Sequence, residues 1–218
     1  GTFVSLTENF CSIGMEQPAG NKITGNPSSH PALSVKWVED FPDIPLNRNE
    51  AYKLRVTSKG VEIEAITETG VYRAIQTLRQ LTEKKGNGIA ITGCEITDWP
   101  AFRIRGFMQD VGRTYISTDE LKREIAILAR YKINVFHWHL TENQAWRLQS
   151  KVFPMLNDSV NTTRQPGKYY TLEEARELAA FCKQHHVLLI PEIDMPGHSA
   201  AFVRTFRHDM QSLSLIHI

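Results

Sequence analysis

Carboxylates, histidines and an arginine occur in three groups in the second half of the sequence, and each group follows a short apolar stretch. In chain order the groups are Asp110 with Arg113, then His137, His139 and Glu142, and finally Glu192, Asp194 and His198. Neighbouring carboxylates set the charge and the tautomer of a histidine, so such groups suit polarisation or proton transfer. These residue types predict a site for acid–base chemistry if the fold brings the groups together.

The stretch from residue 187 to 198 carries the third group. Residues 187–190 are apolar without interruption, which predicts a strand that is buried on both faces. Two carboxylates, two prolines, a glycine and a histidine follow its C-terminal end, where parallel α/β folds bind ligands. The alternative interpretation is a strand followed by an ordinary Pro-Gly turn that contains a hydrogen-bonded His198.

Strands and helices alternate around the three groups. Apolar spacing predicts strands at 102–110, 133–140 and 187–190, helices at 117–132 and 171–186, and a long loop at 141–170. Ser117 or Thr118 is expected to cap the first helix, and Thr171 with Glu174 has capping-box spacing. The residues expected to face inward from the first helix are Leu121, Ile125, Leu128 and Tyr131. This order predicts a parallel sheet, either doubly wound or part of a (β/α) barrel.

The C-terminal ends of parallel strands emerge on one side of a sheet, so the three groups are expected to share one mouth. Each group also has a simpler interpretation. Asp110 and Arg113 could only pair with each other at the rim, and Glu142 could be a solvated loop residue. His137 and His139 point to the same side of their strand and could be half of a metal site. No third ligand has convincing spacing, so we predict no metal.

Three tryptophans, Trp99, Trp138 and Trp146, lie near the predicted strand ends in the sequence. A tryptophan at a polar mouth offers a flat face to a sugar ring. Trp138 lies between the two histidines and is expected to point into the core instead.

The first hundred residues have a different pattern. Residues 1–47 are rich in turns, with a possible short strand at 34–38. Alternating segments at 51–57 and 61–66 predict a hairpin, residues 70–82 an amphipathic helix, and residues 89–91 and 94–96 returning strands. We therefore expect a small α+β domain over residues 1–98, with the helix on an antiparallel sheet and a supporting role.

The totals exclude several classes of function. The 218 residues carry a formal net charge of +1, which gives no electrostatic footprint for nucleic acid. No apolar run approaches the roughly 20 residues of a membrane-spanning helix. The three cysteines, Cys11, Cys94 and Cys182, are too far apart to indicate a zinc site or a disulfide framework. No cofactor is indicated.

Three motifs resemble the first three barrel strands of the family 20 glycoside hydrolases, the β-N-acetylhexosaminidases. They are Arg-Gly-Phe-Met-Gln-Asp-Val-Gly-Arg at 105–113, Asn-Val-Phe-His-Trp-His-Leu-Thr-Glu-Asn-Gln-Ala-Trp-Arg at 134–147, and Pro-Glu-Ile-Asp-Met-Pro-Gly-His-Ser at 191–199. Residues 50–54, 70–74 and 76–81 are similar to the small domain that precedes this barrel. The resemblance implies an incomplete TIM (β/α)₈ barrel, its first three β/α units, over residues 99–218.

The resemblance also implies a function and roles for individual residues. The family removes terminal β-linked N-acetylglucosamine or N-acetylgalactosamine from glycans, with the acetamido oxygen of the substrate as the nucleophile. Arg113 would bind ring hydroxyls at the non-reducing end. The resemblance implies that three further residues support catalysis: Asp194, His198 and Glu142. It implies that three others bind the substrate: Asp110, His139 and Trp146. Glu142 stands where the family usually has aspartate, which leaves its exact role open.

The catalytic pair of the family, an Asp-Glu after Gly-Gly, does not occur in this sequence, and Asp119-Glu120 opens a helix instead. A full barrel needs about 250 residues, so we expect a truncated, inactive chain whose open sheet edge promotes self-association. The alternatives are a non-catalytic carbohydrate-binding or assembly module, or an unrelated barrel hydrolase. The family implies export from the cytoplasm. Residues 213–218 have no helical pattern, which suggests a non-native end.

Overall fold

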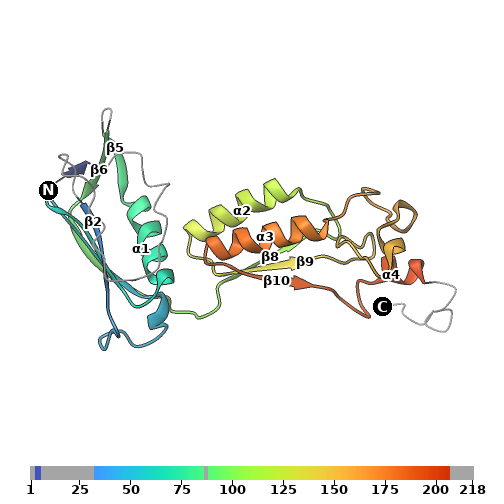
Figure 1. Cartoon of the computed structure of the whole chain (residues 1–218), viewed down its shortest axis with the longest axis horizontal. Coiled ribbons are helices and arrows are strands. Elements are labelled where there is room, and N and C mark those ends of the chain that lie inside the picture. Colours follow the sequence, from blue (N-terminus) through green and yellow to red (C-terminus); the bar gives the residue numbers. More distant parts are fainter. Residues whose placement is uncertain (1–2, 6–31, 86–87, 207–218) are drawn as a thin grey trace. The chain divides into compact units, whose positions relative to one another are not determined.

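The computed structural model describes residues 3–5, 32–85 and 88–206 of the chain. The chain divides into two compact units, residues 1–103 and 104–218, each of which is taken by itself. Their elements are labelled in Figure 1. Among the described residues no helix is long and apolar enough to cross a membrane. The suspected non-native end at 213–218 lies outside the described residues.

A four-stranded sheet forms the centre of the first unit, in the order β2-β4-β3-β7. Its strands are β2 (Ala32–Trp37), β3 (Tyr52–Thr57), β4 (Gly60–Ala65) and β7 (Cys94–Asp98). Every second side chain of β3 and β4 is buried, as the alternating sequence predicts. The predicted hairpin is therefore confirmed, with β3 and β4 antiparallel.

Helix α1 (Glu68–Gln80) covers the buried face of this sheet. Its apolar residues Val71, Ala74 and Leu78 pack into the same core as Leu54 and Ile63. Gly70 permits the close approach, because a Cβ atom there would lie 2.5 Å from the carbonyl oxygen of Ala51. The predicted helix at 70–82 is thus confirmed, shifted by two residues.

The prediction of a purely antiparallel sheet was wrong. β2 runs parallel to β4, because the segment from 38 to 51 crosses over before β3 begins. Alternation of side chains fixes the faces of a strand but not its direction. The strand predicted at 89–91 is β6 (Gly88–Thr92), but it belongs to a second sheet that was not predicted, β1-β6-β5, with β1 (Phe3–Ser5) and β5 (Thr82–Lys85).

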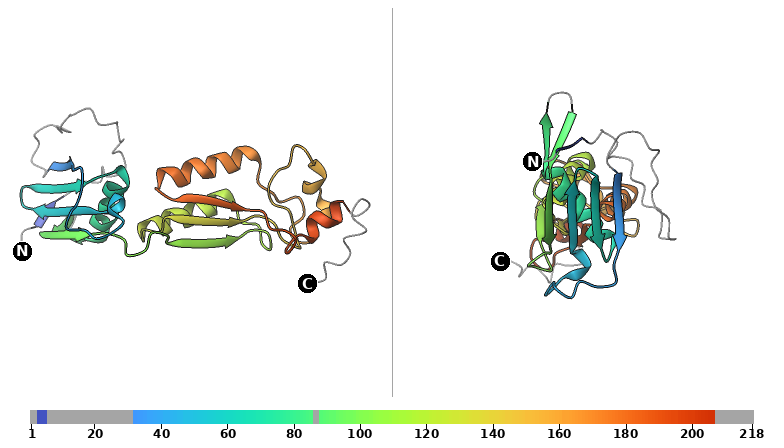
Figure 2. Two further views of the ribbon diagram at one scale, coloured as in Figure 1. Left: turned by 90° about the horizontal axis from the view of Figure 1, so that it is seen from below. Right: turned by 90° about the vertical axis from the view of Figure 1, so that its left-hand side faces the viewer.

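Three parallel strands form the second unit, in the order β10-β9-β8. They are β8 (Gly106–Asp110), β9 (Val135–His139) and β10 (Leu188–Glu192). Helices α2 (Thr118–Arg130) and α3 (Leu172–Gln184) lie side by side on one face of the sheet, as Figures 1 and 2 show. The predicted parallel α/β arrangement is confirmed. The remaining helical segments are η2 (Arg48–Glu50) in the first unit, and η3 (Pro154–Asn157), η4 (Ser159–Asn161) and α4 (Ala200–Thr205) in the second.

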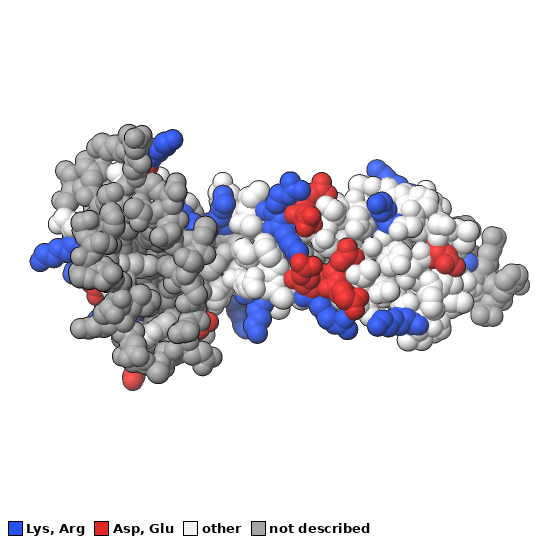
Figure 3. Space-filling view, turned by 45° about the horizontal axis from the view of Figure 1, so that its top comes forward, with Lys and Arg blue, Asp and Glu red and all other residues white. Residues whose placement is uncertain are grey.

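The helix starts are the most accurately predicted features. Ser117 with Glu120, and Thr171 with Glu174, form complete capping boxes, in which side chain and backbone satisfy each other's hydrogen bonds. Lys122 of α2 lies 2.5 Å from the Glu177 carboxylate of α3. On the face of the second unit seen in Figure 3, acidic and basic groups lie next to each other, as expected for a solvated surface with a small net charge.

Three details of the second unit differ from the predictions. The first strand begins at Gly106 rather than at 102, and Phe102 and Ile104 are exposed. Tyr131 does not face inward; α2 ends at Arg130, so Tyr131 is 74% exposed and Ala129 is buried in the core. β10 is not buried on both faces, since helices cover only one face and Leu188 and Ile190 remain exposed on the other.

Candidate active site

The register of the three parallel strands brings the three groups together. His139 lies opposite Asp110 on one side and opposite Glu192 on the other. The three side chains therefore form a row across the C-terminal ends of β8, β9 and β10. This confirms the expectation that the strand ends share one mouth.

Arg113 is held at this mouth by two carboxylates. Its backbone N–H donates to Asp110 Oδ1 at 3.0 Å, and its guanidinium forms ion pairs with Asp110 and Glu142. Burial alone would raise the pKa of Asp110, but the hydrogen bonds and the charge of Arg113 outweigh it and lower that pKa. The hydrogen bond with Asp110 raises the pKa of Arg113. Asp110 and Arg113 do pair at the rim, and the pair extends to Glu142.

Glu142 is the centre of the site, and the interpretation as a solvated loop residue was wrong. Its side chain is only 1% exposed, and it pairs with both Arg113 and His198 Nδ1. Gly112 makes the contact possible, because a Cβ atom at that position would lie 2.7 Å from the Glu142 Cβ. Arg113 and His198 together compensate a carboxylate that would be costly to bury alone.

Glu192 joins the two histidines of β9. Its Oε2 atom lies 3.0 Å from His139 Nδ1 and also pairs with His137 Nε2. Burial alone would raise the pKa of Glu192, but the hydrogen bonds and charges of His139 and His137 prevail and lower it. Both histidines therefore point to the same side of β9, as predicted. Sequence reasoning gave Glu192 no role, because strand pairing decides which residues it meets.

A narrow cleft with room for about one water molecule lies beside Glu142. Asp194, His198 and Trp146 line it, together with Phe202. The backbone N–H of Asp194 donates to Thr141 Oγ1 at 2.9 Å, which fixes the chain after β10 against the end of β9. These contacts bring Asp194, His198 and Trp146 into one site, as the sequence predicted.

The three tryptophans have different surroundings. Trp146 donates its indole N–H to Leu148 O at 2.7 Å and presents its ring to the cleft beside Phe202. Trp138 is 1% exposed, which confirms its place in the core. Trp99 packs in the first unit beside Phe41 and Ile44, so nothing places it among the strand ends.

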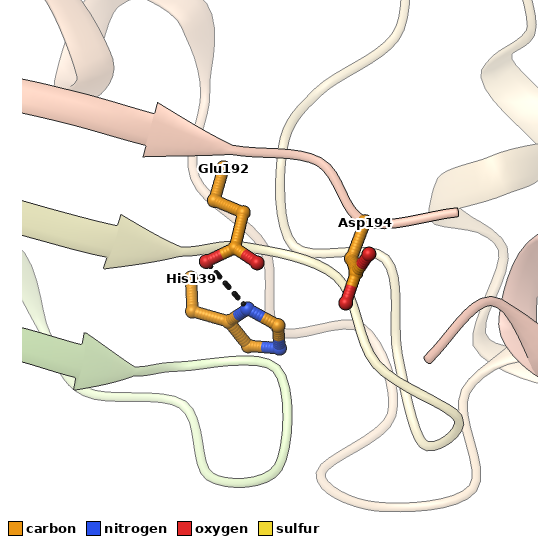
Figure 4. A group of neighbouring side chains, drawn as sticks. All are labelled: His139, Glu192 and Asp194. Carbon is orange, nitrogen blue, oxygen red and sulfur yellow. Dashed lines mark ion pairs between the residues drawn. The ribbon is translucent and has the colours of Figure 1, made fainter. Parts of the chain in front are cut away.

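His139, Glu192 and Asp194 could in principle hold a metal ion, since one ligand atom of each lies within 4.8 Å of the others (Figure 4). One imidazole and two carboxylates suit a divalent cation such as Zn²⁺. The half-site weighed from the sequence was His137 with His139, whereas the group that the structure brings together contains His139 with two carboxylates from the chain at the end of β10. The same Glu192 oxygen is already engaged by two imidazoles, which lowers its availability as a ligand.

Arg147 is a second residue that sequence reasoning left without a role. It is completely buried and donates to four backbone oxygens: Val111 at 3.0 Å, Arg164 at 2.9 Å, Lys168 at 2.8 Å and Gln165 at 3.2 Å. Burial lowers the pKa of its guanidinium. Arg147 thereby ties the loop after β9 to the turn that carries Arg113.

Comparisons with known proteins agree with this geometry. Residues 102–213 match the family model described as glycosyl hydrolase family 20, catalytic domain, and residues 14–99 match glycosyl hydrolase family 20, domain 2. The chain belongs to glycosyl hydrolase family 20. The resemblance of the three strand motifs is thus confirmed, and with it the assignment to the glycoside hydrolases.

Relatives within family 20 include curated bacterial proteins and solved structures. A beta-hexosaminidase of Porphyromonas gingivalis is 39% identical over 204 residues, which cover 88% of this chain and 24% of the relative. A beta-hexosaminidase of Vibrio furnissii is 38% identical over a segment that covers 71% of this chain and 28% of the relative. The crystal structure of a beta-N-acetylhexosaminidase from Bacteroides fragilis superposes with a TM-score of 0.73 at 33% identity, over 81% of this chain and 36% of that one. The chain thus spans about a quarter of the two curated relatives.

Proposed function

We propose that this family 20 chain is part of a β-N-acetylhexosaminidase that removes terminal, non-reducing N-acetylglucosamine or N-acetylgalactosamine from β-linked glycans. The observation that carries the proposal is the buried Glu142, which joins Arg113 to His198 at the mouth of three parallel strands. This arrangement holds a cation and an imidazole at fixed positions beside a cleft. Hydrogen-bonding groups held in this way suit a neutral sugar that has many hydroxyl groups.

Arg113 is proposed to bind the ring hydroxyls. Its side chain is 48% exposed, although Asp110 and Glu142 fix its direction. A planar guanidinium held by carboxylates on one side still offers donors to paired hydroxyl oxygens on the other. Asp110, His139 and Trp146 are proposed to complete the substrate contacts, with the Trp146 ring as an apolar surface for the sugar.

Glu142, His198 and Asp194 are proposed to support a general acid. His198 Nδ1 lies beside both the Glu142 carboxylate, which accepts hydrogen bonds, and the Arg113 guanidinium, which donates them, at 3.4 Å from the latter. These two groups fix the direction of the imidazole ring, and Nε2 is left for a further partner. In a substrate-assisted mechanism the acetamido oxygen attacks the anomeric carbon, and a carboxylic acid protonates the leaving oxygen. The sequence contains no Gly-Gly-Asp-Glu motif, so that acid would come from outside these 218 residues.

The second unit is proposed to be the first three β/α units of a TIM barrel, with domains at 1–98 and 99–218. The open face of its sheet supports this. Met108, Leu188 and Ile190 are 53%, 61% and 42% exposed there, and strands of a closed barrel would bury such residues. In the absence of those strands, the open face and edges would promote self-association.

The test compares this chain with a longer protein from the same reading frame. Both are assayed on 4-nitrophenyl β-N-acetylglucosaminide and on the corresponding galactosaminide. We expect hydrolysis by the longer protein and none by this chain. A longer protein that contains an Asp-Glu pair after Gly-Gly but hydrolyses neither substrate would refute the proposed function. Turnover by the pure chain would refute its dependence on further residues.

A carbohydrate-binding or assembly role without catalysis is the second candidate for the chain as it stands. The lack of the Asp-Glu pair favours it. A reading frame that continues without such a pair, together with binding of N-acetylglucosamine, would establish it in place of the enzyme.

An enzyme that acts on glycans outside the cell would be exported, which fractionation of cells that express the longer protein would test.

A further inference from the structure

Glu192 faces two histidines through different ring nitrogens. It meets Nδ1 of His139 at 3.0 Å and Nε2 of His137 with the same oxygen atom, Oε2. Strand pairing sets this geometry, since Glu192 lies directly opposite His139, and Ile190, two residues earlier, lies opposite His137. Figure 4 shows the Glu192 carboxylate and the His139 ring facing each other across the two strands.

An ionised carboxylate can only accept hydrogen bonds. The proton of neutral His139 therefore lies on Nδ1, and that of neutral His137 lies on Nε2. One carboxylate thus selects opposite tautomers in two histidines of the same strand. For His139 this reverses the preference of a free histidine side chain, which carries its proton mainly on Nε2.

The other nitrogen of His139 has no partner among the described residues. Nε2 is buried without a hydrogen bond, and the whole side chain is only 7% exposed. The groups near this ring are the Asp110 and Asp194 carboxylates and the His198 ring, whose centroid lies 5.9 Å away. Carboxylates have no proton to give to a neutral nitrogen. A buried acceptor without a donor is unfavourable, so Nε2 is suited to accept a hydrogen bond from a bound group.

We propose that Glu192 is a positioning residue that holds His139 in the Nδ1–H tautomer, so that Nε2 accepts a hydrogen bond from a hydroxyl or amide N–H of a bound N-acetylhexosamine. The tautomer follows from the geometry of this chain alone. The identity of the donor rests on the proposed function. The same arrangement of a carboxylate behind an imidazole orients histidine ligands in metal sites, where it fixes which nitrogen faces the metal.

Nitrogen-15 NMR of the histidine rings tests the tautomer directly on this chain. The spectra are recorded at about pH 8.5, above the ordinary histidine pKa of about 6.5, and His139→Asn assigns the signals. We expect wild-type His139 to be protonated at Nδ1. Glu192→Met, which keeps the length but removes the acceptor, should shift His139 toward the Nε2–H form. Glu192→Gln keeps an acceptor oxygen and should retain the Nδ1–H form.

The matched control is Glu177→Gln, which removes a carboxylate on the outer face of α3 and should leave both tautomers unchanged. A wild-type His139 protonated at Nε2 would overturn the proposal, whether or not any variant folds. So would an unchanged Nδ1–H form in a folded Glu192→Met chain. If Glu192 had only a structural role, its variants would lose stability without a change in the tautomer of His139. Denaturation of the same variants therefore separates a structural role from a positioning role.

Titration with N-acetylglucosamine tests the donor. We expect the Nε2 signal of His139 to shift as the sugar binds, and Glu192→Met to abolish the shift. Shifts at Arg113 and Trp146 without one at His139 would overturn the acceptor role and leave the proposed function intact. Absence of shifts at all three residues would count against sugar binding itself and therefore against the proposed function, while the tautomer result would stand.

Discussion

The four-stranded sheet of the first unit and the parallel sheet of the second use the same kinds of side chain in different ways. In the first unit β3 and β4 bury their apolar residues almost completely against α1, and their outer face pairs charges across strands, as in Arg55 with Glu95. In the second unit the helices bury one face only. Apolar residues stay exposed on the other face, and charges gather at the strand ends.

This difference separates a sheet whose apolar face is covered from a sheet with an open apolar face. The first unit does bury one ion pair, Arg73 with Glu50 at 3.0 Å, but it lies beside a closed core. In the second unit the buried charge of Glu142 meets Arg113 and His198 at an open cleft. Charges that a fold does not need for packing are maintained there at a cost, which is typical of functional sites.

The largest expected effect compares the same side chain in the two sheets. Ile63 in β4 is completely buried, whereas Ile190 in β10 is 42% exposed on the open face. Ile63→Ala should lower the free energy of unfolding of the first unit by about 3 kcal/mol, because it removes packed methyl groups and leaves a cavity. Ile190→Ala should lower that of the second unit by less than about 1 kcal/mol.

Hydrogen exchange of peptides from each unit, measured at increasing urea concentration, reports the unfolding of the two units separately. The experiment is repeated over a range of protein concentrations, because self-association through the open face would add to the cost of Ile190→Ala. Equal losses for both variants at low concentration would contradict the distinction between a covered and an open sheet face.

The second prediction compares two glutamates that pair with arginine. Glu142 is 1% exposed and pairs with Arg113, whereas Glu95 is 71% exposed and pairs with Arg55. Glu142→Gln should destabilise the second unit by about 2 kcal/mol, less than a fully buried pair would cost, because Arg113 is half exposed. Glu95→Gln should change the first unit by about 0.5 kcal/mol or less. Thermal or urea denaturation checks both predictions. If Glu142→Gln left the stability of the second unit unchanged, Glu142 would not be the residue that holds the site together.

The sequence predicted local structure best where a short pattern has one physical solution. Capping-box residues Ser117 and Thr171 mark helix starts within the chain itself, and alternation marks the faces of β3 and β4. The direction of β2 and the burial of β10 could not be read in this way. Both depend on which strand or helix lies alongside, and distant parts of the chain supply that neighbour.

The same limit applies to the site. Residue types and strand ends were enough to bring Asp110, Arg113, His139 and Asp194 together. They were not enough to show that Glu142 is buried. Glu142 can pack there because Gly112 has no side chain, and no motif reveals that contact. Glu192 was placed at the mouth but given no individual role, because its partners come from the neighbouring strand in a register that no motif specifies.

The smallest expected effect concerns acid. The folded state lowers the pKa values of Asp110 and Glu192. Each carboxylate therefore contributes stability that is complete above its ordinary pKa of about 4 and is lost as the pH falls through the lowered value. Asp110→Asn removes one of these contributions, so the second unit should lose about 0.5–1 kcal/mol at neutral pH and show a flatter loss of stability below pH 4.

Asp43 supplies the matched control for this acid effect. Its pKa is also lowered, by the hydrogen bond from Lys53, but it lies on the surface of the first unit. Asp43→Asn should therefore leave the pH dependence of the second unit unchanged when hydrogen exchange of β9 peptides is followed between neutral and acid pH. If Asp110→Asn left the acid response of those peptides as steep as before, the charges at the strand ends would contribute no more than a solvated surface does, and the contrast between the two sheets would rest on apolar packing alone.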